Sequence, residues 1–128
     1  MSPAGEEPVE IVAEKLIGGG RALAHHDGAT WMVAGALPGE QVRAEATRRR
    51  AGIIEARTLE VLSGPHPARL QDPCPQTGVC GGCDWPHVDP RAGADLKAAA
   101  AAEAARAFPD LAARIASAPI RRSADAYR

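Results

Sequence analysis

Residues 21–33 read RALAHHDGATWMV, and this stretch predicts a β-hairpin. Two runs suited to strands, Arg21–His26 and Thr30–Val33, flank the pair Asp27-Gly28. Asp-Gly between two such runs is a strong signal for a two-residue hairpin turn. We therefore expect antiparallel β-structure at the centre of the fold.

Short strands continue on both sides of this hairpin. Further turn signals at Gly18-Gly19-Gly20, Leu37-Pro38-Gly39-Glu40 and Ala51-Gly52 divide residues 8–62 into runs of alternating or β-branched side chains. The five runs are residues 9–13, 21–26, 30–33, 42–47 and 53–62. Five short strands with tight connections predict a small, closed, five-stranded barrel of the OB-like or SH3-like type.

The core of this barrel is expected to be small. Aromatic residues make up 3% of the 128-residue chain, and alanine supplies much of its 45% hydrophobic content. In so aromatic-poor a domain, Trp31 is expected in the core. The chain has no apolar run long enough to cross a membrane, and residues 1–15 do not resemble a signal peptide. These features predict a cytoplasmic protein.

Charge is distributed unevenly, although the net charge is only −1. Four glutamates lie near the start of the chain, whereas five arginines and two glutamates lie between Gln41 and Arg57. The candidate RNA-binding residues of this segment are Arg43, Arg48, Arg49 and Arg50. Such arginines can hold phosphates and stack on bases. The alternative is a solvated edge strand, whose charge discourages aggregation.

All three cysteines lie in one segment, Cys74-x5-Cys80-Gly81-Gly82-Cys83. Six prolines between Ser63 and Pro90 are expected to exclude regular ladders there, so something other than secondary structure must order the segment. A bound metal or cluster would do that. Three clustered thiolates suit an iron–sulfur cluster or structural zinc, and each normally takes a fourth ligand. His87 has a spacing that suits zinc. The remaining alternative is three free thiols in a loop.

Beyond the cysteines the sequence becomes helical. Asp89-Pro90 is typical of an N-cap followed by proline at the first helical position, and residues 92–107 have very high helix propensity. A second short helix is expected after Pro109, with Leu111 and Ile115 on one face. The expected organisation is a barrel at 8–62, a cysteine-rich segment at 63–88 and helices at 89–118.

The order of these motifs resembles a known family. The part similar to a TRAM domain, a small RNA-binding barrel attached to RNA-modifying enzymes, comprises Val9-Glu10-Ile11, Leu16 to Ala24, Gly28, Val33, Gly35 to Glu40 and Val42. The part that resembles the [4Fe–4S] segment of uracil-C5 (5-methyluridine) RNA methyltransferases comprises Cys74-Pro75, Cys80-Gly81-Gly82-Cys83, His87 and Leu96-Lys97. Tyr127-Arg128 is similar to the start of the motif that opens that family's central region.

The resemblance implies the RNA-binding, iron–sulfur N-terminal region of an S-adenosylmethionine-dependent enzyme that methylates uracil C5 in rRNA or tRNA. It implies that Cys74, Cys80 and Cys83 ligate a [4Fe–4S] cluster and that none is the methyl-transfer nucleophile. In the family, the fourth cluster cysteine, the S-adenosylmethionine-binding domain and the catalytic residues lie beyond this stretch. We therefore expect this chain alone to be an inactive monomer that binds RNA and neither DNA nor membrane.

Two further hypotheses compete with this one. The first is a free-standing TRAM-type RNA-binding adaptor with a Cys3His zinc site that uses His87. The second is a structural module that uses the barrel as a protein-docking surface.

Overall fold

The computed structural model describes residues 6–71, 75–76 and 85–121. The chain divides into two compact units. The first consists of residues up to Leu16 together with Arg21–Pro67, and the second of Ile17–Gly20 together with residues from Ala68 onward.

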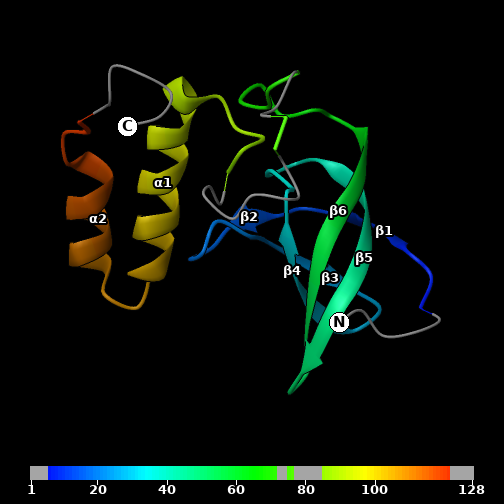
Figure 1. Cartoon of the computed structure of the whole chain (residues 1–128). Coiled ribbons are helices and arrows are strands. Elements are labelled where there is room, and N and C mark those ends of the chain that lie inside the picture. Colours follow the sequence, from blue (N-terminus) through cyan, green and yellow to red (C-terminus); the bar gives the residue numbers. More distant parts are fainter. Residues whose placement is uncertain (1–5, 72–74, 77–84, 122–128) are drawn as a thin grey trace. The chain divides into compact units, whose positions relative to one another are not determined.

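The first unit is a single curled sheet (Figure 1). Its strands are β1 (Val9–Val12), β2 (Lys15–Leu16), β3 (Ala22–His26), β4 (Ala29–Ala34), β5 (Gln41–Arg50) and β6 (Ile53–Ser63). They are hydrogen-bonded in the order β1-β5-β6-β4-β3-β2. Every neighbouring pair is antiparallel except β4 and β6, which run parallel.

The two edge strands of this sheet, β1 and β2, are close together along the chain. Only Ala13 and Glu14 separate them, and these residues donate backbone hydrogen bonds to Glu40 O (2.9 Å) and Leu23 O (2.8 Å). A sheet whose opposite edges are joined by two residues has to curl on itself. The predicted class, mainly β with a small barrel-like sheet followed by an alanine-rich helix, is confirmed. The sheet differs from the predicted closed barrel of five strands, because it has six strands and is not closed. The additional strand, β2, has only two residues, which is too short for an alternating pattern to predict it.

Both long hairpins turn through residues in the left-handed region. Asp27 (φ 51°) and Gly28 (φ 77°) connect β3 to β4, which confirms the predicted turn. Ala51 (φ 45°) and Gly52 (φ 83°) connect β5 to β6. Two successive positive φ angles give the turn a twist that matches that of the flanking strands.

Small side chains dominate the interior of the sheet. Its larger buried residues are Ile11, Leu16, Trp31, Val33, Leu37, Val42 and Ile54, and alanines at 13, 22, 24, 36, 44, 46 and 56 fill the space between them. Trp31 is 5% exposed, which confirms its predicted place in the core. The interior is narrow, so that alanine is large enough at most positions.

A buried carboxylate closes the predicted turn at Leu37–Glu40. The Glu40 side chain is completely buried; its Oε1 accepts a hydrogen bond from Leu37 N (2.7 Å) and its Oε2 accepts one from His66 N (3.1 Å). Gly39 N also donates to Ala13 O (2.8 Å). Buried backbone N–H groups need such partners, and Glu40 supplies them from within the turn.

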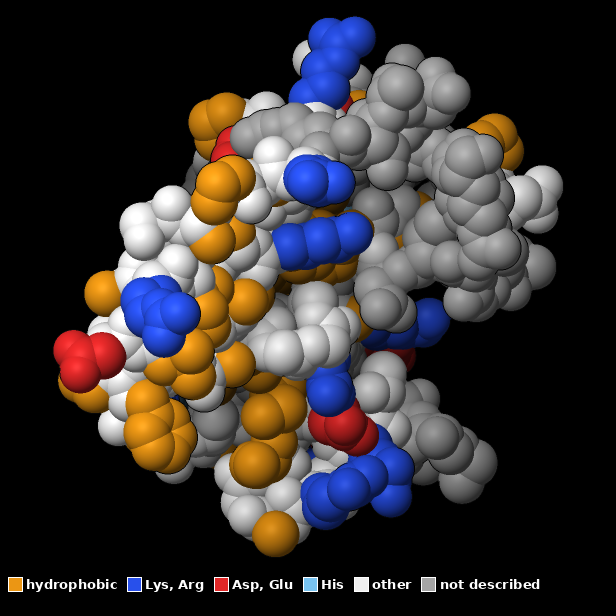
Figure 2. Space-filling model, turned by 90° about the vertical axis from the view of Figure 1, so that its left-hand side faces the viewer, with side chains coloured by type: hydrophobic (Ala, Val, Ile, Leu, Met, Phe, Trp, Pro, Cys, Tyr) orange, Lys and Arg blue, Asp and Glu red, His pale blue; other side chains and the backbone are white. Residues whose placement is uncertain are grey.

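The second unit contains the helices α1 (Pro90–Ala104) and α2 (Pro109–Ser117), which pack against each other (Figure 1). Asp89 caps α1 by accepting a hydrogen bond from Arg91 N (2.9 Å), with Pro90 at the first helical position, as predicted. Phe108 and Leu111 remain exposed, and Figure 2 shows hydrophobic side chains gathered on the face seen from the α2 side. Across the described residues, neither helix combines the length and apolar character of a membrane span.

Candidate nucleic-acid interface

The outward side of the sheet carries most of the arginines of the first unit. Val42, Ala44 and Ala46 of β5 are buried, whereas Arg43 between them is exposed. A register shift between Ala46 and Arg48 then inserts one extra residue, Thr47, into the strand. This bulge reverses the alternation, so that Arg48 and Arg50 point outward although Ala44 and Ala46 point inward. We call the outward side of β3, β4, β6 and β5 the outer face.

Glu55 of β6 lies among the arginines of the outer face. Its Oε1 accepts a hydrogen bond from Arg21 Nη1 at 2.7 Å, and its Oε2 lies 4.0 Å from Arg48 Nε. The pKa of Glu55 lies below its ordinary value, chiefly because of the Arg21 hydrogen bond. Partial burial opposes this, and the charges of Arg21, Arg50 and Arg48 add to it. The carboxylate therefore stays ionised and offsets part of the surrounding positive charge.

The other predicted arginines differ in how they are paired. Arg43 Nη2 lies 3.2 Å from Glu60 Oε2, and Arg49 Nε donates to Glu6 Oε1 at 2.8 Å. Arg50 has no hydrogen bond or ion pair to any residue that the structure describes. It is therefore the most available cation of the predicted set. All these arginines are exposed.

Two further arginines belong to the same face. Arg57, across from Glu45 in the register, donates from Nε to Glu45 Oε2 at 2.8 Å. Arg21 precedes β3 and reaches Glu55. Neither was singled out from the sequence as an RNA contact, because pairing between distant strands brings them to this face.

Apolar side chains lie between these charges. The strand register places Leu23 beside Met32 and Met32 beside Glu55, and it places Thr30 beside Ile53. Leu23, Met32 and Ile53 are half-buried. A surface of this kind offers cations for phosphates and exposed apolar area for bases.

The predicted cluster ligands Cys74, Cys80 and Cys83 lie outside the described residues. The alternative ligand, His87, is described, and its side chain is 8% exposed. Among residues 6–71, 75–76 and 85–121 there is no group of three or more side chains suited to a metal ion.

Backbone hydrogen bonds connect the two flanks of the cysteine-bearing segment. Leu70 N donates to His87 O (2.9 Å), and Asp89 N donates to Ala68 O (2.7 Å). Arg69 and Val88 form an antiparallel bridge between these two bonds. This short antiparallel pairing of residues 68–70 with 87–89 flanks residues 71–86, which include all three cysteines. The prediction that prolines exclude ladders between Ser63 and Pro90 is therefore wrong at these two flanks, which contain no proline.

Trp85 makes two contacts within the same unit. Its Nε1 donates to Gly20 O at 2.7 Å, and Lys97 Nζ lies 5.9 Å from the centre of its ring. Gly20 has φ +78°, and a Cβ there would overlap the indole. The Gly18-Gly19-Gly20 turn is therefore shaped to receive Trp85.

A small curled sheet with an outer face of arginines and apolar side chains defines a candidate nucleic-acid-binding module. Known proteins similar to this chain are RNA methyltransferases. Over 91 residues the chain is 50% identical to the 23S rRNA (uracil(1939)-C(5))-methyltransferase RlmD of Alkalilimnicola ehrlichii, a match that covers 71% of this chain and 20% of that protein. It is 42% identical over 106 residues to the enzyme of the same name from Nitrosococcus oceani, which covers 83% of this chain and 24% of that protein.

A third relative has a less specific name. It is an uncharacterized RNA methyltransferase of Bdellovibrio bacteriovorus, 39% identical over 80 residues, or 62% of this chain and 20% of that protein. No protein-family model matches the chain. The chain thus spans between a fifth and a quarter of the length of these relatives.

Proposed function

We propose that this chain binds RNA as part of an S-adenosylmethionine-dependent uracil-C5 methyltransferase that acts on 23S rRNA in the cytoplasm. The observation that carries the proposal is the 50% identity to such an enzyme over 71% of the chain. In this assignment, residues 8–62 form a TRAM-type RNA-binding barrel and residues 89–118 form a helical linker. No residue of the chain is assigned to methyl transfer.

RNA would approach the outer face through its phosphates. Arg50 can receive a phosphate without losing a partner. Arg43 and Arg48 would exchange Glu60 and Glu55 for phosphate; ion pairs at exposed positions contribute only about 0–1 kcal/mol, so the exchange costs little. Arginine also binds phosphate through paired N–H groups. The half-buried Leu23, Met32 and Ile53 would then contact bases or ribose.

Residues 63–88 would form the metal centre, with Cys74, Cys80 and Cys83 as thiolate ligands of a [4Fe–4S] cluster. The donor set fits, because iron–sulfur clusters are held by cysteine thiolates. The backbone pairing between Leu70 and His87 supports the proposal as well, because it joins the two flanks of the sequence segment that contains the three cysteines. When bound, the cluster would supply redox or structural chemistry. The alternative is a Cys3His zinc site completed by His87 in a free-standing RNA-binding adaptor.

Salt-dependent RNA binding tests the proposal. We expect a structured 23S rRNA fragment to bind with an affinity that falls steeply with salt, by about 0.7–0.9 log units per phosphate contact for each log unit of salt. Replacing Arg48, Arg49 and Arg50 by alanine should flatten this slope and weaken binding across sequences. The matched control replaces Arg91, Arg106 and Arg114 of the helical unit, which removes the same charge elsewhere. Equal losses in both triple variants, or none in the first, would count against Arg48, Arg49 and Arg50 as RNA contacts.

A further inference from the structure

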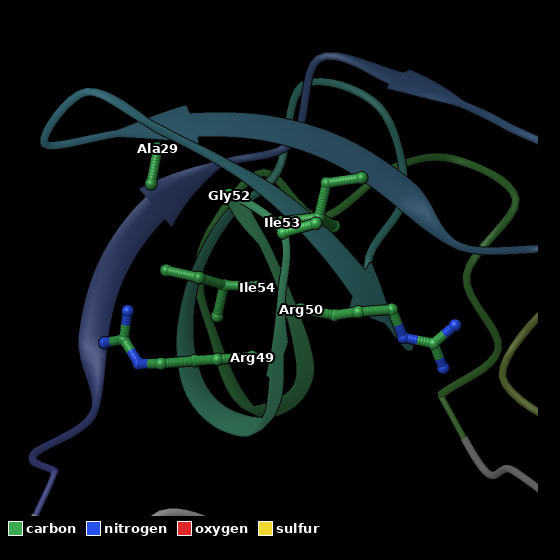
Figure 3. Close-up of a pocket in the computed structure, with 7 residues that line it drawn as sticks. Ala29, Arg49, Arg50, Gly52, Ile53 and Ile54 are labelled. Atoms are coloured by element: carbon green, nitrogen blue, oxygen red, sulfur yellow. The ribbon is translucent and has the colours of Figure 1, made fainter.

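A hollow of about 270 Å³ lies where the β3–β4 and β5–β6 hairpins turn. It is lined by Ala29, Arg49, Arg50, Ala51, Gly52, Ile53 and Ile54. In Figure 3 the side chains of Ala29, Ile54 and Arg49 extend to one side of the hairpin, and those of Ile53 and Arg50 extend to the other. The register explains this division, since Arg49 faces Ile54 and Arg50 faces Ile53 across the β5–β6 pair.

The first of these sides combines an apolar wall with a cation. Ala29 and Ile54 belong to the inward-facing rows that continue into the core through Trp31 and Ala56. Arg49 is the residue at which the inward row of β5 leaves the core and becomes exposed. A Cβ placed on Gly28 or Gly52 would have no atom within 4 Å, so both turns leave the entrance open.

The Arg49 guanidinium is already paired with a carboxylate. Glu6, 43 residues away in the sequence, accepts from Arg49 Nε at 2.8 Å and also contacts Nη2. The side chains of this pair are 54% and 34% exposed, and ion pairs so exposed are weak. An RNA phosphodiester carries one negative charge, as a carboxylate does, and accepts paired hydrogen bonds from arginine. It can therefore take the place of Glu6.

We infer that this hollow is a nucleotide subsite for single-stranded RNA. One base enters the hollow beside Ala29, and its phosphate replaces Glu6 on Arg49. The space is slightly smaller than the roughly 300–1,000 Å³ of pockets for drug-sized ligands, which suits one nucleotide. The inference rests on the proposed RNA binding and adds to it a site at the tips of the two hairpins, where Arg49 of the inward side and Arg50 and Ile53 of the outer face line one hollow.

Uridine 5′-monophosphate is the probe, titrated into the full 128-residue chain labelled with ¹⁵N. Separate titrations use inorganic phosphate and uridine. We expect the nucleotide to shift the amide resonances of residue 29 and residues 51–54 together with the Arg49 Nε–H. Phosphate alone should shift chiefly the Arg49 resonance, and uridine alone chiefly the amides. Shifts confined to other parts of the chain, or no binding of the nucleotide, would overturn the subsite.

Three variants give effects of different sign. Arg49→Ala removes a charged hydrogen-bond donor and should weaken nucleotide binding about 10-fold or more. Ala29→Phe fills the hollow and should weaken binding severalfold, because the base can no longer enter it. Glu6→Gln frees Arg49 and should strengthen binding about 2- to 5-fold. Ala99→Phe and Arg106→Ala on α1 and just beyond it are the matched controls and should leave binding unchanged.

The outcomes separate this inference from the proposed function. If the chain binds rRNA in a salt-dependent way while Arg49→Ala and Glu6→Gln match the unaltered chain, the subsite is wrong and RNA binding stands. Absence of any rRNA binding would contradict the proposed function itself. Should Ala29→Phe fail to fold, as judged by its thermal transition, the opposite changes in nucleotide affinity of Arg49→Ala and Glu6→Gln still test the subsite.

Discussion

Arg21 and Glu55, 34 residues apart in the sequence, form an ion pair on the outer face of the sheet, with 2.7 Å between Nη1 and Oε1. Glu55 also faces Arg48, and the charge of Arg50 acts on it. One carboxylate thus interacts electrostatically with several arginines. This arrangement holds the guanidinium groups together, and it also lowers the net positive charge that RNA would meet.

Acid should weaken the fold through Glu55. Its pKa in the folded chain lies below the ordinary value of 4.5, first because of the Arg21 hydrogen bond. Folding therefore favours the ionised form. This contribution is complete above the unfolded pKa and is lost as the pH falls through the folded pKa. We expect the thermal midpoint of Glu55→Gln to fall less than that of the unaltered chain between pH 5 and pH 3 (about the range in which carboxylates titrate).

Glu60→Gln is the control for this pH dependence. Glu60 is an exposed carboxylate of the same strand, paired with Arg43 at 3.2 Å. Its replacement should leave the pH profile close to that of the unaltered chain. Superimposable profiles for Glu55→Gln and the unaltered chain would contradict the role given to the Arg21–Glu55 pair.

The same substitution of Glu55 should strengthen RNA binding. The amide side chain of Glu55→Gln would keep an oxygen for the Arg21 hydrogen bond while removing the negative charge between Arg21, Arg48 and Arg50. We expect this variant to bind the 23S rRNA fragment about 2- to 5-fold more tightly at low salt, the scale of exposed ion pairs. The difference should shrink at high salt because exposed charges are screened. Glu103→Gln on α1 removes the same charge and should have no such effect; weaker binding by Glu55→Gln would show that its charge supports the interface.

Local sequence signals predicted the strands and helices, whereas the arrangement of the candidate RNA-binding arginines depends on pairing between strands. Asp27-Gly28 and Asp89-Pro90 act within a few residues, so the hairpin and the start of α1 could be read from the sequence. The direction of Arg48 could not, because it depends on the register shift between β5 and β6. The partnerships of Arg49 with Glu6 and of Arg21 with Glu55 join residues 43 and 34 positions apart.

Gly20 and Gly18 offer a direct test of the Trp85 contact. At position 20 a Cβ would overlap the indole, and the residue would also have to keep the backbone angle φ +78°. At Gly18 an added Cβ would meet no atom within 4 Å. We expect Gly20→Ala to lower the free energy of unfolding by about 1–3 kcal/mol, the usual cost of a strained backbone position. Gly18→Ala should change it by less than about 0.5 kcal/mol. Urea denaturation followed by tryptophan fluorescence measures both.

The emission of Trp85 adds a second readout. Displacing the indole from Gly20 O exposes its N–H to water, so Gly20→Ala should shift the tryptophan emission to longer wavelength in the folded state. Trp31 is buried in the sheet and should contribute an unchanged component. Equal stability and emission for Gly18→Ala and Gly20→Ala would show that the contact with Trp85 does not fix this turn.

The last prediction concerns the metal centre and the ladder that bounds it. We expect protein extended beyond Arg128 and purified without oxygen to contain iron and sulfide with broad visible absorption, and its Cys80→Ala or Cys83→Ala variant to lose both. With the centre gone, the amides of Leu70 and Asp89, which donate across the ladder at 2.9 and 2.7 Å, should exchange with solvent faster. Closing a loop of this length costs conformational entropy that metal ligation offsets. Amides of β3 and β4, which share no ligand with the site, should exchange as before.

The His87→Ala variant distinguishes the two candidate metals. It should leave an iron–sulfur cluster held by thiolates largely intact, whereas a Cys3His site would release its zinc. Protein that contains one zinc and no iron, and loses it in His87→Ala, would overturn the cluster assignment in favour of the adaptor.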